Sequence, residues 1–362
     1  MMISKTLRAA VMVAILLSVS SAAATETPEA TAEPTGTPVI SADTIAQLAP
    51  VVQIDFDGLG ANAEPFNTGW FAMSDDGRYL TVVNAIGQVI LLDDSGMVIG
   101  MHGRSGYYFA GAAFDEAGEH VYTLFHDGFN AAIFQHTLAH ELVSGVTFAF
   151  DGQPLDLWVD DDGVPWAEVL VDGMMQVMRI VLDTETVGLD LLPYGPDGDP
   201  DAVVRIGRIP PPYVVTSSEA GDVKVWDMTL GEVIREAEVD DGPAVFGQIN
   251  ADATTLIWRD PASLVLRLLD LETGEDRLVT ALDGEYVQYF LVTPAADVIL
   301  GVQSGEREEV FAWDAATGAR YELGPYRACG RVPDMARLSV DGATLVIGCD
   351  TGVEIWRITT DA

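Results

Sequence analysis

The ten residues LRLLDLETGE at positions 266–275 combine an apolar run with an aspartate and a glycine-containing turn, and this combination occurs three more times in the chain. The other copies are IVLDTETVG at 180–188, VKVWDMTLGE at 223–232 and FAWDAATGA at 311–319. Their aspartates, Asp183, Asp227, Asp270 and Asp314, are separated by 44, 43 and 44 residues. An apolar, β-branched run that ends in a polar turn is typical of a β-strand. A constant period of this length indicates that one unit of strands is repeated along the chain.

The same period extends beyond these four copies in both directions. A further step of 43 residues reaches Arg357 in VEIWRITT, where Trp356 keeps an aromatic residue but the aspartate is replaced. Toward the N-terminus, VILLDDSG places Asp93 ninety residues before Asp183, which leaves room for one more unit around His136 in AAIFQHTLAHE. The sequence therefore predicts seven units of about 45 residues each.

A second strand is predicted in each unit, after a turn rich in aspartate and glycine. It is recognised in SDDGRYLTVV, DEAGEHVYTL, DDDGVPWAEV, NADATTLIW, TPAADVILGV and VDGATLVIG. The fourth unit has IPPPYVVTS in this place, and its three consecutive prolines predict a rebuilt loop. No long helical periodicity follows the first 24 residues, so the protein is expected to be almost entirely β.

This pattern resembles the repeats of WD-repeat β-propellers, within the wider group of WD-like and quinoprotein-like propellers of the exported bacterial type. The resemblance rests on Val225-Trp226-Asp227 and Ala312-Trp313-Asp314, which keep the Trp-Asp pair, and it covers nearly all of residues 45–360. It implies an all-β, seven-bladed β-propeller of four-stranded antiparallel blades. The Gly-His dipeptide of WD repeats is absent from every unit, so the buried histidine and aspartate network of that family is not expected here.

The two ends of the chain are expected to close the ring. The last unit ends shortly after Trp356 without a fourth strand, whereas Ala46–Asp55 (AQLAPVVQID) precedes the first complete unit and is apolar enough to form one. We therefore predict that this segment is the outer strand of the seventh blade, where it also protects an exposed sheet edge. A ring of six or eight blades is the alternative to seven.

The first 24 residues have the features of a secretory signal peptide. Lys5 and Arg8 precede an uncharged run, and the small residues Ala22-Ala23-Ala24 fit a cleavage site near Ala24. The uncharged run is shorter than the roughly 20 residues that a membrane span needs; a retained anchor is the alternative. Residues 25–44, rich in Thr, Pro, Glu and Ala, are expected to be a linker, and residues 45–362 the propeller. The mature protein is thus expected to be secreted, periplasmic or at the cell surface, with no membrane span.

The chain of 362 residues has 56 acidic and 18 basic side chains, and its formal charge of −38 becomes −40 once the signal peptide is removed. Hydrophobic residues make up 49 % and the mean hydropathy is +0.22, which excludes an acidic disordered polymer. The charge opposes binding to nucleic acids and anionic lipids, because both attract Lys and Arg. It is compatible with a cationic partner, and added salt is expected to stabilise the protein by screening its self-repulsion.

Two cysteines in an exported chain are expected to pair. Cys329 and Cys349 lie on either side of a hairpin turn at Asp341-Gly342, so the two thiols can approach each other. We therefore predict a disulfide bond between them, with two separate buried thiols as the alternative.

All five histidines lie between positions 102 and 140. On a strand, residues separated by two, four or six share a face. His120 with His126, and His136 with His140, are thus two candidate imidazole pairs on neighbouring strands of the second blade, of a kind that binds zinc or copper. Polar rings satisfied by hydrogen bonds or solvent are the alternative.

Acidic runs are expected to be solvated turns. They occur at Asp160-Asp161-Asp162, at Asp197, Asp199 and Asp201, and at Asp240-Asp241. The DGDPD run alternates oxygen donors as calcium loops do, but Ala202 stands where such a loop needs glycine, so only an irregular calcium site is an alternative. No cofactor is predicted.

No nucleophile motif, Walker loop or dinucleotide-binding glycine motif occurs in the sequence. Trp226, Trp313 and Trp356 stand at the repeat position and are expected in the blade core rather than on a carbohydrate. The sequence therefore favours a monomeric, non-enzymatic binding or protein-interaction platform for an unknown protein or small molecule. The alternative is a propeller enzyme, a metal-dependent hydrolase or a quinoprotein-like oxidoreductase, with its site at the central channel.

Overall fold

Twenty-eight β-strands and one short 3₁₀ helix, η1 (Ile45–Gln47), make up the regular structure of the described residues. The computed structural model describes residues 38–56, 66–84, 87–103, 107–139, 141–160, 162–172, 174–182, 187–193, 205–207, 213–217, 221–227, 230–238, 245–250, 252–259, 265–282, 287–303, 308–327, 335–349 and 351–359. Among these residues no helix has the length and apolar character required to cross a membrane.

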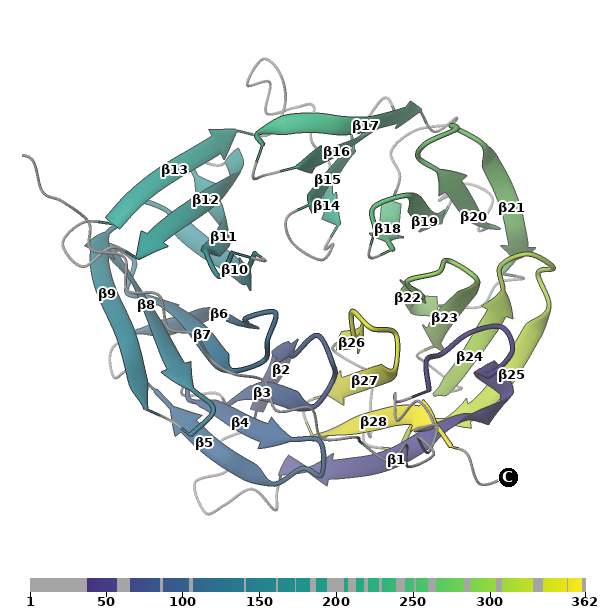
Figure 1. Ribbon diagram of the computed structural model, residues 1–362, viewed down its shortest axis with the longest axis horizontal. Helices are drawn as coiled ribbons and strands as arrows, with labels where there is room; N and C mark the ends of the chain where they lie inside the picture. Colours follow the sequence, from purple (N-terminus) through teal and green to yellow (C-terminus); the bar gives the residue numbers. More distant parts are fainter. Residues whose placement is uncertain are drawn as a thin grey trace, which may run out of the picture. The chain divides into compact units, whose positions relative to one another are not determined.

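Seven four-stranded antiparallel sheets form the blades of a ring (Figure 1). The first three blades are β2 (Phe66–Met73), β3 (Tyr79–Asn84), β4 (Val89–Asp93) and β5 (Val98–His102); β6 (Tyr108–Phe114), β7 (His120–His126), β8 (Asn130–Thr137) and β9 (Leu142–Ala149); and β10 (Gln153–Val159), β11 (Pro165–Val171), β12 (Met174–Leu182) and β13 (Val187–Pro193). The next three are β14 (Arg205–Gly207), β15 (Tyr213–Ser217), β16 (Asp222–Asp227) and β17 (Glu232–Glu238); β18 (Val245–Ile249), β19 (Thr255–Arg259), β20 (Val265–Asp270) and β21 (Asp276–Ala281); and β22 (Val287–Val292), β23 (Val298–Gln303), β24 (Glu309–Asp314) and β25 (Arg320–Pro325).

The seventh blade combines the two ends of the chain, as the sequence predicts. It contains β26 (Met335–Leu338), β27 (Thr344–Cys349) and β28 (Gly352–Ile358), and its outer strand is β1 (Leu48–Asp55). β1 runs antiparallel to β28, with Leu48 opposite Ile358 and Asp55 opposite Gly352. The predicted seven-bladed all-β propeller and its mode of closure are confirmed.

In the other six blades the spatial order of the strands follows their order in the chain, and the first strand lies nearest the centre of the ring (Figure 1). The two predicted strand patterns fall on the second and third strands of the blades. Asp93, Asp227, Asp270 and Asp314 each end a third strand, whereas Asp183 lies outside the described residues.

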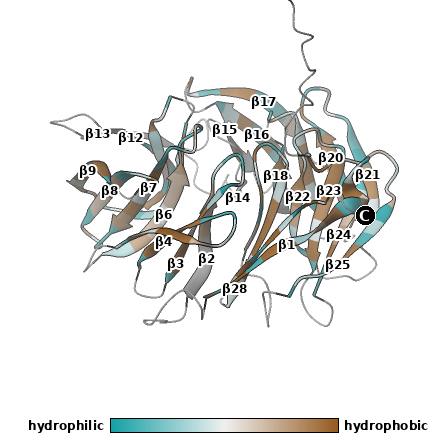
Figure 2. Cartoon of the chain, turned by 60° about the horizontal axis from the view of Figure 1, so that its bottom comes forward, coloured by the Kyte–Doolittle hydropathy of each residue, from teal (hydrophilic) through white to brown (hydrophobic). Residues whose placement is uncertain are grey.

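The apolar residues lie where one blade packs against the next. All six residues of β27 are buried, as are the first four of β4, because neighbouring blades cover both faces of these strands. One core cluster joins Leu80 and Ile90 of the first blade to Val346 and Ile355 of the seventh. Apolar colouring accordingly follows the strands in Figure 2. Packing on both faces explains how so acidic a chain is also so hydrophobic.

The tryptophans at the repeat position lie in the blades. Trp313 of β24 and Trp356 of β28 are buried, as predicted. Trp226 of β16 is half-buried, and its Nε1 donates a hydrogen bond to Thr216 Oγ1 at 3.0 Å. These side chains therefore stabilise the blades and leave little aromatic surface for a ligand.

Replacing Ile54 by alanine tests the closure of the ring. This side chain belongs to β1, is 5 % exposed and packs with Phe56, Val353 and Ile355. We expect Ile54→Ala to lower the free energy of unfolding by about 2–5 kcal/mol, because it leaves a cavity between the ends of the chain. Urea denaturation followed by tryptophan fluorescence measures the change.

Val51→Ala is the matched control, because Val51 lies in the same strand but is 42 % exposed. A change of about 0.5 kcal/mol or less is expected for it. Equal effects of the two substitutions would show that burial of β1 does not stabilise the ring.

Candidate functional site

The two sides of the ring differ in how the strands are joined. On one side, the turn face, connections link the first strand of a blade to the second and the third to the fourth. On the other side, the loop face, connections link the second strand to the third and lead to the next blade. Five residues join the first two strands in all seven blades, and four or five join the third and fourth in the first six. On the loop face the connections vary from two to five residues within blades and from three to eleven between blades.

The five-residue turns of the turn face share one hydrogen-bonding pattern. In six blades a side-chain oxygen at the start of the five-residue turn accepts a hydrogen bond from a backbone N–H at the end of the turn: that of the first residue of the second strand in five blades, and that of Val164, just before Pro165, in the third. The pairs are Ser74 with Tyr79, Asp115 with His120, Asp160 with Val164, Asn250 with Thr255, Thr293 with Val298 and Ser339 with Thr344, at 2.7–3.1 Å. Four residue types therefore perform one function, which a search for a single repeated residue does not detect.

The aspartates that end the third strands close the next turn in the same way. Asp314 Oδ1 accepts hydrogen bonds from the backbone N–H groups of Thr317 at 2.7 Å and Ala316 at 2.9 Å. These bonds lower the pKa of Asp314, and bonds from Thr273 and Glu272 lower that of Asp270. Burial acts to raise the pKa of Asp93, but hydrogen bonds from Ser95, Met97 and Gly96 outweigh it and lower the pKa overall.

The turns of neighbouring blades also contact one another. Asn250 Nδ2 donates to the carbonyl of Pro294 at 3.2 Å, and the Asp341 N–H donates to the carbonyl of Asp75 at 3.3 Å. Gly77 has a φ of +66°, and a Cβ at this position would lie 2.5 Å from the side chain of Thr344. The turn face is therefore a frame whose turn-closing polar groups are engaged within the fold.

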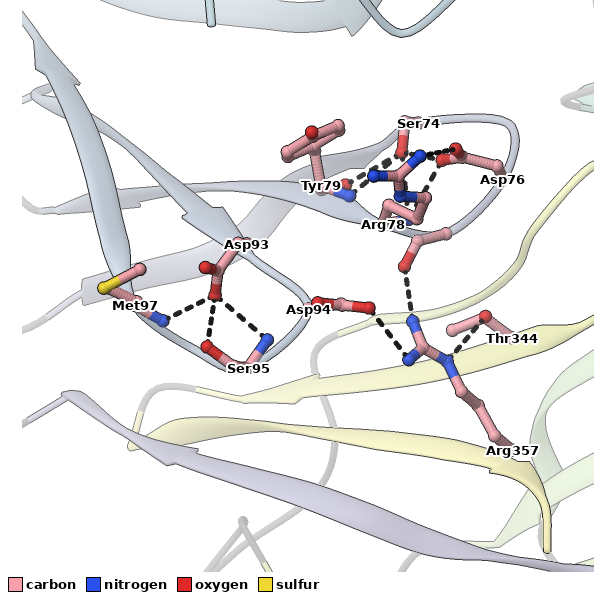
Figure 3. A network of polar contacts seen from close by, with 11 residues as sticks. Ser74, Asp76, Arg78, Tyr79, Asp93, Asp94, Ser95, Met97, Thr344 and Arg357 are labelled. Carbon is pink, nitrogen blue, oxygen red and sulfur yellow. Dashed lines mark hydrogen bonds and ion pairs between the residues drawn. The ribbon is translucent and has the colours of Figure 1, made fainter. Parts of the chain in front are cut away.

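Arg357 connects the last blade to the first (Figure 3). Its guanidinium donates to Thr344 Oγ1 at 3.1 Å, to Asp94 Oδ2 at 3.1 Å and to the carbonyl of Gly77 at 3.0 Å. Arg357 stands where most of the repeats have an aspartate, and it stabilises the junction between the two ends of the chain. Two other arginines bridge neighbouring blades, Arg235 to Glu272 and Arg277 to the carbonyl of Ala315.

A groove with a volume of about 470 Å³ lies on the turn face between the first two blades. Its lining residues are Arg78, Tyr79, Asp93, Asp94, Ile99, Leu138 and Ala139. Asp93 is engaged by its own turn and Asp94 by Arg357, as Figure 3 shows. Both carboxylates therefore stabilise the fold. The groove is a junction between blades rather than a reactive centre.

The candidate metal-binding histidines are separated in the second blade. His120 and His126 lie at opposite ends of β7, six residues or about 20 Å apart. His120 Nδ1 lies 2.6 Å from Asp115 Oδ2. His136 of β8 is opposite Val121 and therefore on the other face of the sheet, where its ring centroid lies 3.9 Å from that of His102 in the first blade.

His140 lies outside the described residues, within which no group of three or more His, Cys, Asp or Glu side chains is arranged to hold a metal ion. Zinc or copper binding stays a prediction. Among the acidic runs, Asp160 is buried and accepts a hydrogen bond from Trp166 Nε1 at 2.7 Å. Asp162 is exposed, as expected of a solvated turn. The remaining members, Asp161, Asp197, Asp199, Asp201, Asp240 and Asp241, lie outside the described residues.

Two aromatic side chains on the loop face were not singled out by the sequence. Phe129, in the turn between β7 and β8, is 81 % exposed, and Tyr108, at the start of β6, is 70 % exposed. The ring of Tyr108 lies 5.8 Å from that of His126, whose pKa is lowered by burial although Asp127 acts to raise it. The repeat pattern offers no signal for these residues, because they lie outside it.

Comparison with known proteins finds a shared fold but no matching family. No family model matches the chain, and no curated protein matches it. The β-propeller domain of Cps50 (Swd1) from Myceliophteria thermophila is similar in structure, with a TM-score of 0.60, 12 % identity, and coverage of 81 % of this chain and 97 % of that one. The two chains share the β-propeller fold. The predicted resemblance to WD-repeat propellers is thus confirmed at the level of the fold.

Removing the Arg357 side chain is expected to weaken the junction between the first and seventh blades. Arg357→Ala removes three hydrogen bonds from a guanidinium that is 21 % exposed, and we expect the free energy of unfolding to fall by about 2 kcal/mol. Arg78→Ala is the control, because Arg78 is 64 % exposed and lies 3.8 Å from Asp76. We expect a change of about 0.5 kcal/mol or less for it, and a similar loss in both variants would contradict the role of Arg357.

Acid is expected to destabilise the turn face. Because Asp93, Asp270 and Asp314 have pKa values below the ordinary 3.8, their carboxylates stabilise the fold above that pH and lose this contribution as the pH falls through their folded-state pKa values. We expect the free energy of unfolding to fall below a pH of about 4. The fall should be shallower in the triple variant D93N/D270N/D314N, since asparagine keeps an acceptor but does not titrate.

Urea denaturation across the pH range measures this difference. A second triple variant, E116Q/E119Q/E232Q, makes the same change in net charge at exposed positions. If the two triple variants show the same pH dependence, general charge repulsion rather than turn hydrogen bonding governs acid stability.

Proposed function

We propose that the mature chain is an extracytoplasmic, non-enzymatic binding platform that contacts its partner through the loop face. The observation that carries this proposal is the contrast between the two faces. Five residues separate the first two strands in every blade, and in six blades the described turns share one hydrogen-bonding pattern, while connections on the loop face range from two to eleven residues. Connections that vary between repeats are the segments that most often carry binding sites on a rigid scaffold.

The hydrogen bonds of the turn face also favour the loop face as the binding surface. Side-chain oxygens on the turn face are used for turn closure, and three arginines bridge neighbouring blades. Such groups are poorly available to a ligand. The exposed aromatic residues Tyr108 and Phe129 lie on the loop face instead, and aromatic side chains are enriched in protein–protein interfaces.

Export is part of the proposal. It is supported by the signal-like first 24 residues and by the two cysteines, since disulfide bonds persist in oxidising compartments. Cys349 is buried at the end of β27, while Cys329 lies outside the described residues. We propose that the two form the bridge that the sequence predicts. The intact mass of the secreted chain, with and without reductant, reports both cleavage near Ala24 and the bridge.

Two positions in one strand test which face binds. Glu232 and Glu238 are both exposed and lie at opposite ends of β17, the first on the turn face and the second on the loop face. Asp151 on the loop face and Glu116 on the turn face form a second matched pair. Each of the four is changed to arginine, and the immobilised variants are used to capture proteins from the extracellular fluid of the producing organism.

We expect Glu238→Arg or Asp151→Arg to reduce the captured partner, by about tenfold for a contact residue, and Glu232→Arg and Glu116→Arg to leave it unchanged. Quantitative mass spectrometry measures the amounts. Losses confined to the turn-face variants would overturn the assignment of the loop face. Turnover of ester, phosphoester or alcohol substrates by the purified chain would overturn the non-enzymatic role.

A further inference from the structure

Tyr108 and Phe129 are the two most exposed large apolar side chains among the described residues, at 70 % and 81 %. Both lie on the loop face of the second blade. Tyr108 begins β6 and is directly opposite His126, which ends β7, and Phe129 lies in the turn that follows His126. Two exposed aromatic rings are therefore presented at the same end of one blade.

The turn that carries Phe129 is fixed by hydrogen bonds. Asp127 Oδ1 accepts bonds from the N–H groups of Phe129 at 2.9 Å and Asn130 at 2.7 Å. The carbonyl of Phe129 accepts a bond from the N–H of Phe150 at 3.0 Å, which ties the turn to the chain just before Asp151. Phe129 is thus held outward by an ordered turn, so little conformational entropy is lost when a partner packs on its ring.

The described charged residues in the loop-face connections within and between the second and third blades, Asp127, Asp151 and Asp172, are all acidic. The sequence contains no Lys or Arg from Ser105 to Met178, a range that covers the second blade and most of the third. The same range contains twelve acidic residues, of which these three belong to loop-face connections and the other nine to strands or turn-face connections. Asp127 supplies a charge two residues before Phe129, and the exposed Asp151 directly follows Phe150, whose N–H donates to the Phe129 carbonyl.

This combination selects the chemistry of the partner. Anionic lipid, nucleic acid and a second copy of this chain all bring further negative charge, which the acidic blades repel. An arginine side chain satisfies both features at once. Its guanidinium stacks on an aromatic ring and pairs with a carboxylate through a planar set of N–H donors.

We propose that the loop face of the second blade is a docking surface for an arginine-rich segment of a protein partner, with arginines stacked on Tyr108 and Phe129 and paired with Asp151. This inference rests on the proposed binding function and gives it a location and a partner chemistry. Asp127 contributes mainly through its charge, because its oxygens already accept hydrogen bonds within the turn.

Fluorescence anisotropy with labelled nonapeptides of arginine and of lysine tests the proposal on the full mature chain. Measurements are made at an ionic strength of about 0.15 M, where long-range attraction is screened. We expect Tyr108→Ala and Phe129→Ala each to weaken binding of the arginine peptide by about threefold, and more in the double variant. The lysine peptide should bind more weakly and depend less on the two rings.

Matched controls separate this surface from the general negative charge. Leu230→Ala and Leu278→Ala remove apolar side chains that are 65 % and 57 % exposed on other blades, and are expected to leave binding unchanged. Asp151→Asn is compared with Glu232→Gln, which makes the same change in charge on the turn face. Unchanged melting temperatures establish that each variant is folded.

Equal affinity of the wild type and the two aromatic variants for the arginine peptide would overturn the docking surface. If the loop-face arginine variants still lose the captured partner in that case, the binding platform stands and only its location and partner chemistry are wrong. If capture and peptide binding are both insensitive to every loop-face variant, the proposed function fails as well.

Discussion

The pairing of β1 with β28 is the contact on which the closed ring depends. Each blade has two apolar faces, and only a closed ring covers both of them in every blade. The outer strand of the seventh blade comes from the other end of the described chain, so Leu48–Asp55 must pair with Gly352–Ile358. The buried side chain of Ile54 and the three hydrogen bonds of Arg357 stabilise the same junction. The two most distant parts of the described chain are therefore held together by strand pairing, apolar packing and charge.

The arrangement of the blades explains how the chain is both hydrophobic and acidic. Apolar residues occupy strands that neighbouring blades cover on both faces, and aspartates serve as hydrogen-bond acceptors in turns, where their charge stays near water. With few basic residues available, several arginines lie between blades, where each guanidinium reaches an acceptor in the next blade. Between Ser105 and Met178 the sequence has twelve acidic residues and no Lys or Arg.

These interactions give the two faces of the ring different roles. On the turn face the first two strands are separated by five residues in every blade, and turns of neighbouring blades contact one another. The connections of the loop face differ in length and composition. The groove beside Asp93 and Asp94 illustrates the difference, since its carboxylates are engaged by the frame, whereas Phe129 on the loop face is held outward by its turn.

The sequence by itself determined the number of blades, the second and third strands of each unit and the strand that closes the ring, because a fixed period and local turn chemistry specify them. It did not determine which side chains meet across blades. His136 lies beside His102 and away from His120, since the register of β7 and β8 sets the face and the packing of two blades sets the neighbour. The exposure of Tyr108 and Phe129 was likewise decided by the tertiary structure, because an aromatic residue in a strand or turn has the same local pattern whether a neighbouring blade covers it or not.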